Sequence, residues 1–448
     1  MLPAVSPRLS AGLWLPALAL ALGCGRVGYD AEAPARWIFV DDDQADFDLG
    51  RYDAGAAALA WQAGQVRFAG APPFPATPNG GGLYVSRPHD TGDDTAIWET
   101  LAWLPVAPQG RPLPDGGAAD AGYAEGGVSM ADNLLLLHLD GAGAAAHGDP
   151  VPDASGLGHH GHIVLAGQGA THVGGAFRQA LDLDRDAWVT LDGFFFDFGT
   201  GDFTWAVWVK MRDCADSNDN RVAMGGGGAG DDPHVWIGAA CPERCAGRDG
   251  ADMIYRDGTR MGPSLTACTG VVLDDGAWHH LASVKRGHTA PPASIHLYVD
   301  GREVGAASHD YGAATLSYDG GEIRLGGFNL GGAQYNTRVT VDEAAMWKRA
   351  LGDAEIAALY RRGAVHLELQ VRACADGACD SEPFLGPDGA GATWFTEADW
   401  SGAAGDQKGS LAALGLVGAL GQYRARFATA MPAVSPGLLR VTLEARRP

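Results

Sequence analysis

Positive charge is scarce in this sequence, and its scarcity excludes one class of function. The 448 residues include 32 lysines and arginines against 54 acidic residues, so the formal net charge is −22. Only 4 of the basic residues are lysines. A protein that binds nucleic acid needs a basic face to neutralise phosphates, so we exclude that class. We expect an acidic, soluble protein that anionic surfaces repel unless a divalent cation intervenes.

The signatures of non-globular chains are also missing. Hydrophobic residues make up 46% of the sequence, which is too high a share for a disordered protein. The 66 glycines follow no Gly-X-Y period, and this excludes a collagen-like chain. Since a typical domain has ~150 residues, the length allows roughly three folded domains.

The first 23 residues have the features of a signal peptide. Arg8 precedes an apolar run over 11–23, which is shorter than the ~20 residues of a spanning helix. The run ends at Cys24 and resembles a bacterial lipobox, although Leu22 stands where that motif prefers a small residue. We predict a lipoprotein signal peptide over 1–23, lipidation of Cys24 and a tether over 24–36.

The predicted location follows from this reading of the N-terminus. A lipidated Cys24 would anchor the exported protein in a membrane, at the bacterial outer membrane or cell surface. The alternative is ordinary export to a secreted or periplasmic location, with Cys24 an incidental thiol.

The remaining cysteines are even in number, which in an exported protein is typical of disulfide bonds. They are Cys214, Cys241, Cys245, Cys268, Cys374 and Cys379. Zinc binding by the group over 214–268 is the alternative. Cys374 and Cys379 bracket a tight turn, and we expect them to form a local disulfide.

Strand patterns dominate 133–363. The segment 203–210 alternates apolar residues with period two, and Asp-Gly at 300–301 is a strong hairpin signal. Only 353–361 has a helical pattern, with Gly363 expected as its stop. Many short strands with glycine-rich turns and almost no helix predict a β-sandwich or barrel.

These strands resemble the LamG-like jelly roll of the concanavalin A-like lectin/glucanase superfamily. The matching segments follow one another in the family's order: DASGLGHHG at 153–161, ALDL at 180–183, FTWAVWV at 203–209, DGAWHHLA at 275–282, LYVDG at 297–301 and VDEAAMW at 341–347. The resemblance implies a two-sheet jelly roll, often used to bind glycans or proteins and often holding a structural calcium ion. The segment 214–268 is longer than in the family.

The two ends of the chain, 37–114 and 364–448, each carry strands with a single apolar face. Each set needs a second sheet to cover that face, and together they supply about eight strands, enough for one sandwich. The predicted fold is all-β, with a jelly roll at 133–363 inserted in a second β-sandwich, or flanked by its halves, after a linker at 115–132.

The paired carboxylates of the superfamily's glycanases are absent. Those enzymes carry Glu-x-Asp-x-x-Glu on one strand, which places the acid and the nucleophile on one face. Here Asp342 and Glu343 are adjacent and are expected to face opposite ways. We therefore predict no catalytic residue. A polysaccharide-active enzyme stays an alternative only if two strands together supply a carboxylate pair.

The resemblance makes calcium the cofactor to consider. Asp153 lies in the entry loop and Asp342 near the exit strand, and the two ends of a jelly roll lie near each other, so these are the candidate ligands. The alternative is that Asp153 caps a turn and Asp342 binds backbone. The run over 41–43 lacks the glycine and the terminal glutamate of an EF-hand, and we interpret it as a solvated turn.

For ligand contact we favour the long segment 213–268, because loops on a rigid sandwich commonly carry binding residues. The candidates combine polar groups with aromatic faces, as a sugar requires: Asp231, Asp232, His234, Trp236, Tyr255 and Arg256. The alternative is that Trp236 and Tyr255 belong to core strands.

The predicted function is that of an exported, lipid-anchored binding or adhesion protein that recognises a carbohydrate or cell-surface polymer. Its predicted partners are that glycan or surface macromolecule and, through Cys24, a membrane. A structural spacer without a ligand is the alternative of a different class.

Overall fold

The computed structural model describes residues 36–448, apart from a set of short segments. Those segments are 54, 119–121, 168, 192–197, 213–219, 228–233, 241–244, 246–249, 258–260, 269, 317–321, 331–332, 376, 378 and 400–406. The predicted signal peptide and Cys24 lie outside the described residues. Neither helix of the described part is long and apolar enough to cross a membrane.

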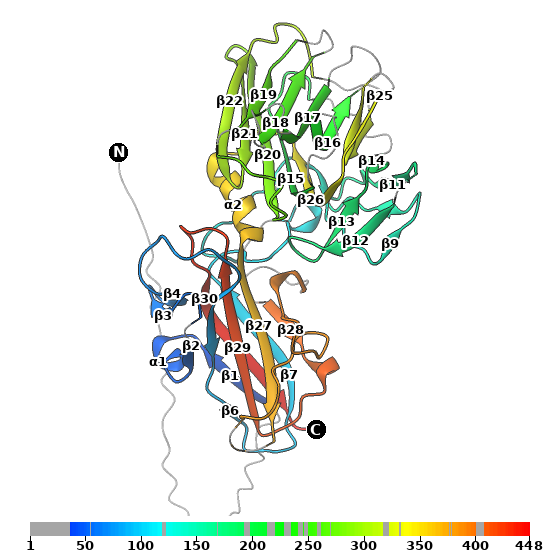
Figure 1. Ribbon diagram of the computed structural model, residues 1–448. Helices are drawn as coiled ribbons and strands as arrows, with labels where there is room; N and C mark the ends of the chain where they lie inside the picture. The colour runs from blue at the N-terminus through cyan, green and yellow to red at the C-terminus, as the bar shows by residue number, and fades with distance from the viewer. Residues whose placement is uncertain are drawn as a thin grey trace, which may run out of the picture. The chain divides into compact units, whose positions relative to one another are not determined.

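The jelly roll consists of two large antiparallel sheets (Figure 1). The nine-stranded sheet contains, in order, β22 (Arg302–His309), β21 (Pro292–Val299), β20 (His279–Thr289), β15 (Phe203–Met211), β26 (Val339–Trp347), β13 (Gln179–Leu183), β12 (Ala170–Gly174) and β9 (Ala144–Ala145), with β8 (Asn133–Leu137) also paired to β26. The eight-stranded sheet contains β10 (Pro150–Val151), β11 (Gly161–Leu165), β14 (Ala187–Leu191), β23 (Glu322–Leu325), β16 (Asn220–Gly227), β17 (His234–Ala240), β18 (Gly250–Arg256) and β19 (Ser264–Ala267). A separate hairpin pairs β24 (Gly327–Leu330) with β25 (Ala333–Asn336).

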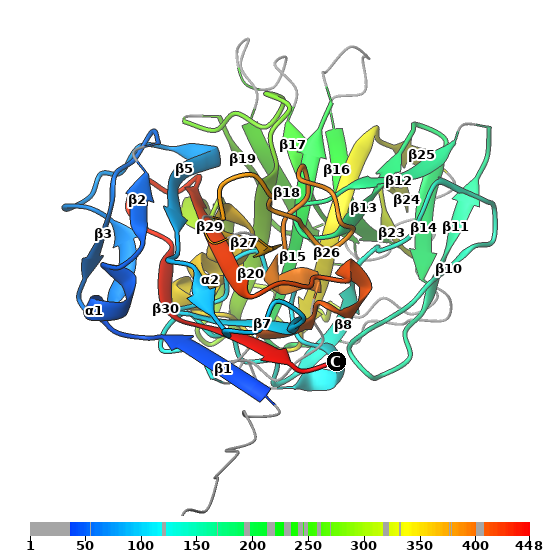
Figure 2. The same ribbon diagram turned by 90° about the horizontal axis from the view of Figure 1, so that it is seen from below.

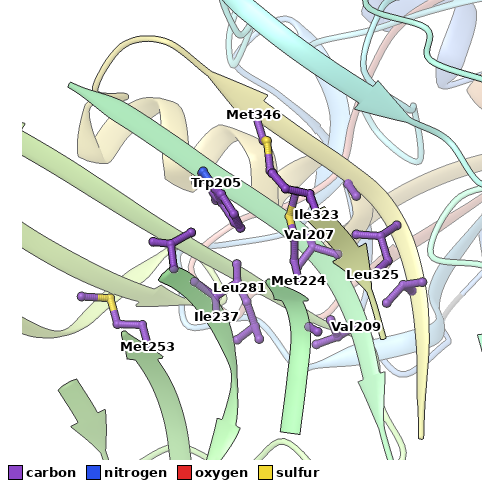
Figure 3. Packing of buried hydrophobic residues seen from close by; sticks show 14 of the residues in the cluster. Trp205, Val207, Val209, Met224, Ile237, Met253, Leu281, Ile323, Leu325 and Met346 are labelled. Carbon is purple, nitrogen blue, oxygen red and sulfur yellow. The ribbon is translucent and has the colours of Figure 1, made fainter. Parts of the chain in front are cut away.

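The core of the jelly roll lies between these two sheets. Trp205, Val207 and Val209 alternate along β15, and all three are fully buried. Figure 3 shows them beside Met224 and Ile237 of the facing sheet. The period-two pattern of the sequence therefore places one face of β15 in the core.

The outer face of the nine-stranded sheet is covered as well. Leu113, Val128 and Met130, from the segment that precedes β8, form a second buried cluster with Ile356 and Leu359 of helix α2 (Asp353–Ala364). Because both faces are covered, every residue of β26 is buried.

Helix α2 extends three residues beyond the predicted 353–361 and includes Gly363, so the predicted stop at that glycine is wrong. A Cβ atom at Gly363 would lie 2.6 Å from Cζ2 of Trp208. Glycine is needed at this position because the indole packs directly against the helix backbone, and the helix ends where β27 begins at Val365.

Strands from both ends of the chain form the sheets of a second sandwich. One sheet contains β28 (Gln407–Ser410), β7 (Ile97–Pro105), β30 (Gly437–Arg446), β4 (Gln65–Phe68) and β3 (Leu59–Gln62), with β1 (Arg36–Asp41) on β30. The other contains β2 (Arg51–Asp53), β5 (Thr77–Val85), β29 (Leu420–Thr429) and β27 (Val365–Cys374), with β6 (His89–Asp90) on β29. Helix α1 (Gln44–Phe47) and the 3-10 turns η1 (Asp115–Gly117), η2 (Glu397–Asp399) and η3 (Ala412–Leu414) complete the described elements.

The first and the last strands of the described chain are neighbours. Figure 2 shows β1 beside β30, and their antiparallel register runs from Arg36 opposite Arg446 to Asp41 opposite Val441. The all-β fold class, with a jelly roll and a second sandwich, is confirmed.

Two disulfide bonds lie within the described residues. One joins Cys374 to Cys379, the local pair that the sequence predicts, and the other joins Cys245 to Cys268. Cys214 and Cys241 lie outside the described residues.

We predict that the second sandwich folds without the jelly roll. Among the described residues, its buried core draws on the chain between Phe47 and Trp103 and between Leu367 and Ala445, and on none from 133–363. Replacing 133–363 by a short glycine-serine bridge should therefore leave a protein that melts cooperatively in calorimetry. A matched truncation that removes 365–448 should abolish the transition of the second sandwich. A bridged protein without any cooperative transition would contradict the prediction.

Candidate functional site

The aromatic residues of the predicted ligand site belong to the core. Trp236 is 1% exposed and packs with Val222, Ile254 and Phe328. Tyr255 is fully buried, its hydroxyl shares a hydrogen bond with Ser283, and burial raises its pKa. These rings offer no face to a sugar, so the alternative reading, core strands, describes them correctly.

Of the other predicted ligand residues, only Arg256 has a described side chain. Asp231 and Asp232 lie outside the described residues, and only the backbone of His234 is described. Arg256 is partly exposed at the end of β18.

Asp153 is a buried turn cap. Its Oδ1 accepts hydrogen bonds from the backbone N–H groups of Leu136 and Ser155, at 3.0 and 2.9 Å. Its Oδ2 accepts from the hydroxyl of Ser155 at 2.7 Å and from the N–H of His159 at 2.9 Å. Burial opposes the charge, but these hydrogen bonds outweigh it and lower the pKa of Asp153. Four donors fill the lone pairs of this carboxylate.

A β-bulge places Asp342 and Glu343 on the same side of the sheet. The register of β15 against β26 shifts between Ala206, opposite Ala345, and Trp208, opposite Asp342. Glu343 is the extra residue and has a positive φ of 47°. The expectation that these two carboxylates face opposite ways is therefore wrong.

Both carboxylates are buried beneath neighbouring loops. Asp342 is 1% exposed, and its Oδ2 accepts the N–H groups of Ala176 and Phe177 at 2.8 and 3.2 Å. Its Oδ1 has no hydrogen-bond partner among the described residues. Glu343 is 4% exposed and accepts the N–H of Leu113 at 3.0 Å. Burial and the charge of Glu343 raise the pKa of Asp342 well above its usual range.

A histidine connects Glu343 to the segment that precedes the jelly roll. Nδ1 of His138 contacts Glu343, and its Nε2 lies 2.8 Å from Oδ1 of Asp115. Burial opposes the charge of the imidazole, but the two carboxylates raise the pKa of His138 to about 10. This chain of charges fixes the loop at Asp115 onto the sheet.

The calcium pair predicted from the sequence does not form one site among the described residues. Asp153 has no lone pair to spare, and Asp342 binds a different backbone segment. The carboxylates in the described chain that lie close enough to share an ion are those of Asp42, Asp43 and Asp46. Asp43 already caps helix α1, and Asp46 pairs with Arg87.

An open pocket of about 490 Å³ lies beside the turn at 276–278 and the C-terminal part of helix α2. We call it the Trp278 pocket; the residues that shape it include Trp208, Trp278, Tyr360, Gly363, His366 and Ala430. Trp208 and Tyr360 stack at 5.6 Å and form its floor, while Trp278 is the more exposed ring. His366 is partly buried, and this desolvation lowers its pKa and favours the neutral imidazole.

A second pocket of about 340 Å³ adjoins the first and shares Tyr360 and Ala430 with it. We call it the Arg302 pocket. Asp300 also lines it, and both oxygens of that carboxylate are occupied, by Nδ1 of His279 at 2.9 Å and the N–H of His280 at 3.0 Å. An aromatic face next to a charged rim is an arrangement that binds ligands.

Sequence reasoning missed this site. The sequence includes Trp278 only in the family-like segment 275–282, and in the structure this residue directly precedes β20, which begins at His279. The available signal was a tryptophan directly after Gly276-Ala277, since an aromatic residue in a turn is less often part of the core.

The fold is that of a β-sandwich protein. Residues 183–357 match the Laminin_G_3 model, described as the concanavalin A-like lectin/glucanases superfamily. This segment is a domain of that superfamily, and the resemblance seen in the sequence is confirmed. No curated protein matches the chain.

Solved structures similar to the chain include three of different origin. The binding domain of Paraclostridial Mosquitocidal Protein 1 has a TM-score of 0.39 and 12% identity. This match covers 55% of the present chain and 62% of that domain's chain. Domain 4 of an extracellular arabinanase from Geobacillus stearothermophilus has a TM-score of 0.35 and 19% identity. This match covers 49% of the present chain and 100% of that domain's chain. The Trypanosoma rangeli sialidase has a TM-score of 0.36 and 17% identity. This match covers 58% of the present chain and 36% of the sialidase chain.

We predict that Asp153→Asn destabilises the protein by about 2–4 kcal/mol at pH 7, because the amide leaves buried N–H and O–H donors unpaired. The pKa of Asp153 is lowered by folding, so its contribution is present above the unfolded value of ~3.9 and is lost as the pH falls toward the folded value. Urea unfolding at pH 7 and pH 3 measures both effects.

Asp310→Asn is the matched control, since this exposed turn aspartate accepts one N–H, from Gly312 at 2.9 Å. It should change stability by less than about 0.5 kcal/mol. If a calcium chelator lowered the wild-type melting temperature but not that of the Asp153→Asn variant, Asp153 would be a metal ligand and our assignment would fail.

Proposed function

We propose that the protein is an exported, lipid-anchored binding protein that recognises a polysaccharide at the Trp278 pocket. The observation that carries the proposal is the partly exposed indole of Trp278, which packs against the stacked rings of Trp208 and Tyr360 and lines a pocket of about 490 Å³. Ligand sites commonly have volumes of roughly 300–1,000 Å³ with aromatic walls. A domain of a lectin/glucanase superfamily is a suitable scaffold for such a role.

The chemistry of the pocket supports binding rather than bond cleavage. Its lining supplies rings, backbone groups and a neutral His366. The carboxylate pair of Asp342 and Glu343 is at most 4% exposed and lies under Leu113 and Ala176. Glycoside hydrolysis needs two carboxyl groups that reach the scissile bond.

Anchoring is the second part of the proposal and rests on the lipobox-like sequence at Cys24. Two or more acyl chains at that residue would hold the protein at a membrane stably. We expect Cys24→Ser to move the protein from the membrane fraction to the soluble fraction and to abolish incorporation of a radiolabelled fatty acid. Cys374→Ser, which removes a different cysteine, should leave the label in place.

The binding test uses the exported chain without its lipid on a polysaccharide array, with and without a chelator. Trp278→Ala should weaken binding about tenfold or more, as expected for the loss of an aromatic anchor, and Trp278→Phe should retain part of it. Trp61→Ala, which removes a partly exposed ring of the second sandwich, should bind as the wild type does. The absence of any bound polysaccharide, or cleavage of one, would contradict the proposal.

A further inference from the structure

The Trp278 and Arg302 pockets are neighbours. Tyr360 and Ala430 line both, so a polymer seated on Trp278 can extend past Tyr360 to the Arg302 pocket. Each has a volume in the range of ligand sites. An extended polymer therefore fits the surface better than a single small molecule.

The far end of this surface carries an available cation. Arg302 begins β22 directly after the hairpin turn in which Asp300 and Gly301 both have positive φ, 51° and 73°. Its side chain is exposed and forms no hydrogen bond or ion pair that involves another described residue. The charge of Arg302 acts on the hydroxyl of Tyr360, whose ring lies between the two pockets.

The acidic groups nearby are already paired. His279 lies between Asp275, at 3.1 Å from its Nε2, and Asp300, at 2.9 Å from its Nδ1. Although burial opposes it, these carboxylates raise the pKa of His279 and favour the imidazolium. The second sandwich contributes Ala430, Met431, Pro432 and Ala433 to the lining of the Arg302 pocket, and none of them is charged.

We propose that the polysaccharide bound here carries carboxylate groups, with a sugar ring stacked on Trp278 and a carboxylate paired with Arg302. This inference rests on the proposed function. The guanidinium fork matches a carboxylate through two parallel hydrogen bonds, which a neutral sugar cannot accept in the same way. The net charge of −22 repels polyanions at long range, so an acidic polymer is held by this local contact rather than by a general basic surface.

The experiment compares acidic polymers with their own neutral forms. Polygalacturonate, alginate and hyaluronan are each tested beside a sample whose carboxylates have been reduced to alcohols, with a chelator present to prevent bridging by calcium. At least one acidic polymer should bind at least tenfold more tightly than its reduced form. Arg302→Gln should remove this preference, whereas Arg302→Lys should retain part of it.

Arg51→Gln is the control for a change of net charge, because this exposed arginine lies in β2 of the second sandwich and pairs with Asp53. It should keep the full preference. Equal binding of acidic and reduced polymers, both lost in Trp278→Ala, would overturn this inference and leave the proposed function intact. A preference that survives Arg302→Gln would also overturn it. Failure of every polymer to bind would overturn the proposed function itself.

Discussion

The central sheet of the jelly roll is buried on both of its faces, and the rest of the structure follows from this constraint. On one face β15 and β26 meet the second sheet, and on the other they meet helix α2 and the segment around Leu113. A polar group on such a sheet must find its partners inside the protein. Glu343 does so by accepting the N–H of Leu113 and by contacting His138, which in turn contacts Asp115. The bulge in β26 thus determines where the incoming chain lies.

The Trp278 and Arg302 pockets lie beside this outer cover. Trp208 is covered by Tyr360 of α2 and by Phe177, and the glycine at 363 allows the helix to approach its ring. The hairpin turn at 300–301 also lies against helix α2, since a Cβ atom at Gly301 would be 3.1 Å from Cα of Ala357. The same aromatic packing that completes the fold therefore supplies the floor of the site.

The sequence predicted the features that depend on local pattern. Alternation along 203–210 and the Asp-Gly turn at 300–301 specify strands and a hairpin, and the structure has β15 and the turn between β21 and β22 at those positions. The bulge at Glu343 was not predictable, because a shift in register depends on the partner strand. The Trp278 pocket was not predictable either, because its lining brings together Trp208, Trp278, Tyr360 and Ala430 from distant parts of the chain. Trp236 was misjudged because a ring in a cysteine-bearing segment can equally occupy a core strand.

The pairing of β1 with β30 has a mechanical consequence. Any force that reaches the folded protein from the segment before Arg36 enters through β1, whose six residues are paired one by one with β30. A pull along the strand direction loads these rungs together in shear, whereas a pull across the sheet would open them in sequence. If the protein is held at its N-terminal side and bound to a polymer elsewhere, its fold would resist unfolding best when the pull runs along β1.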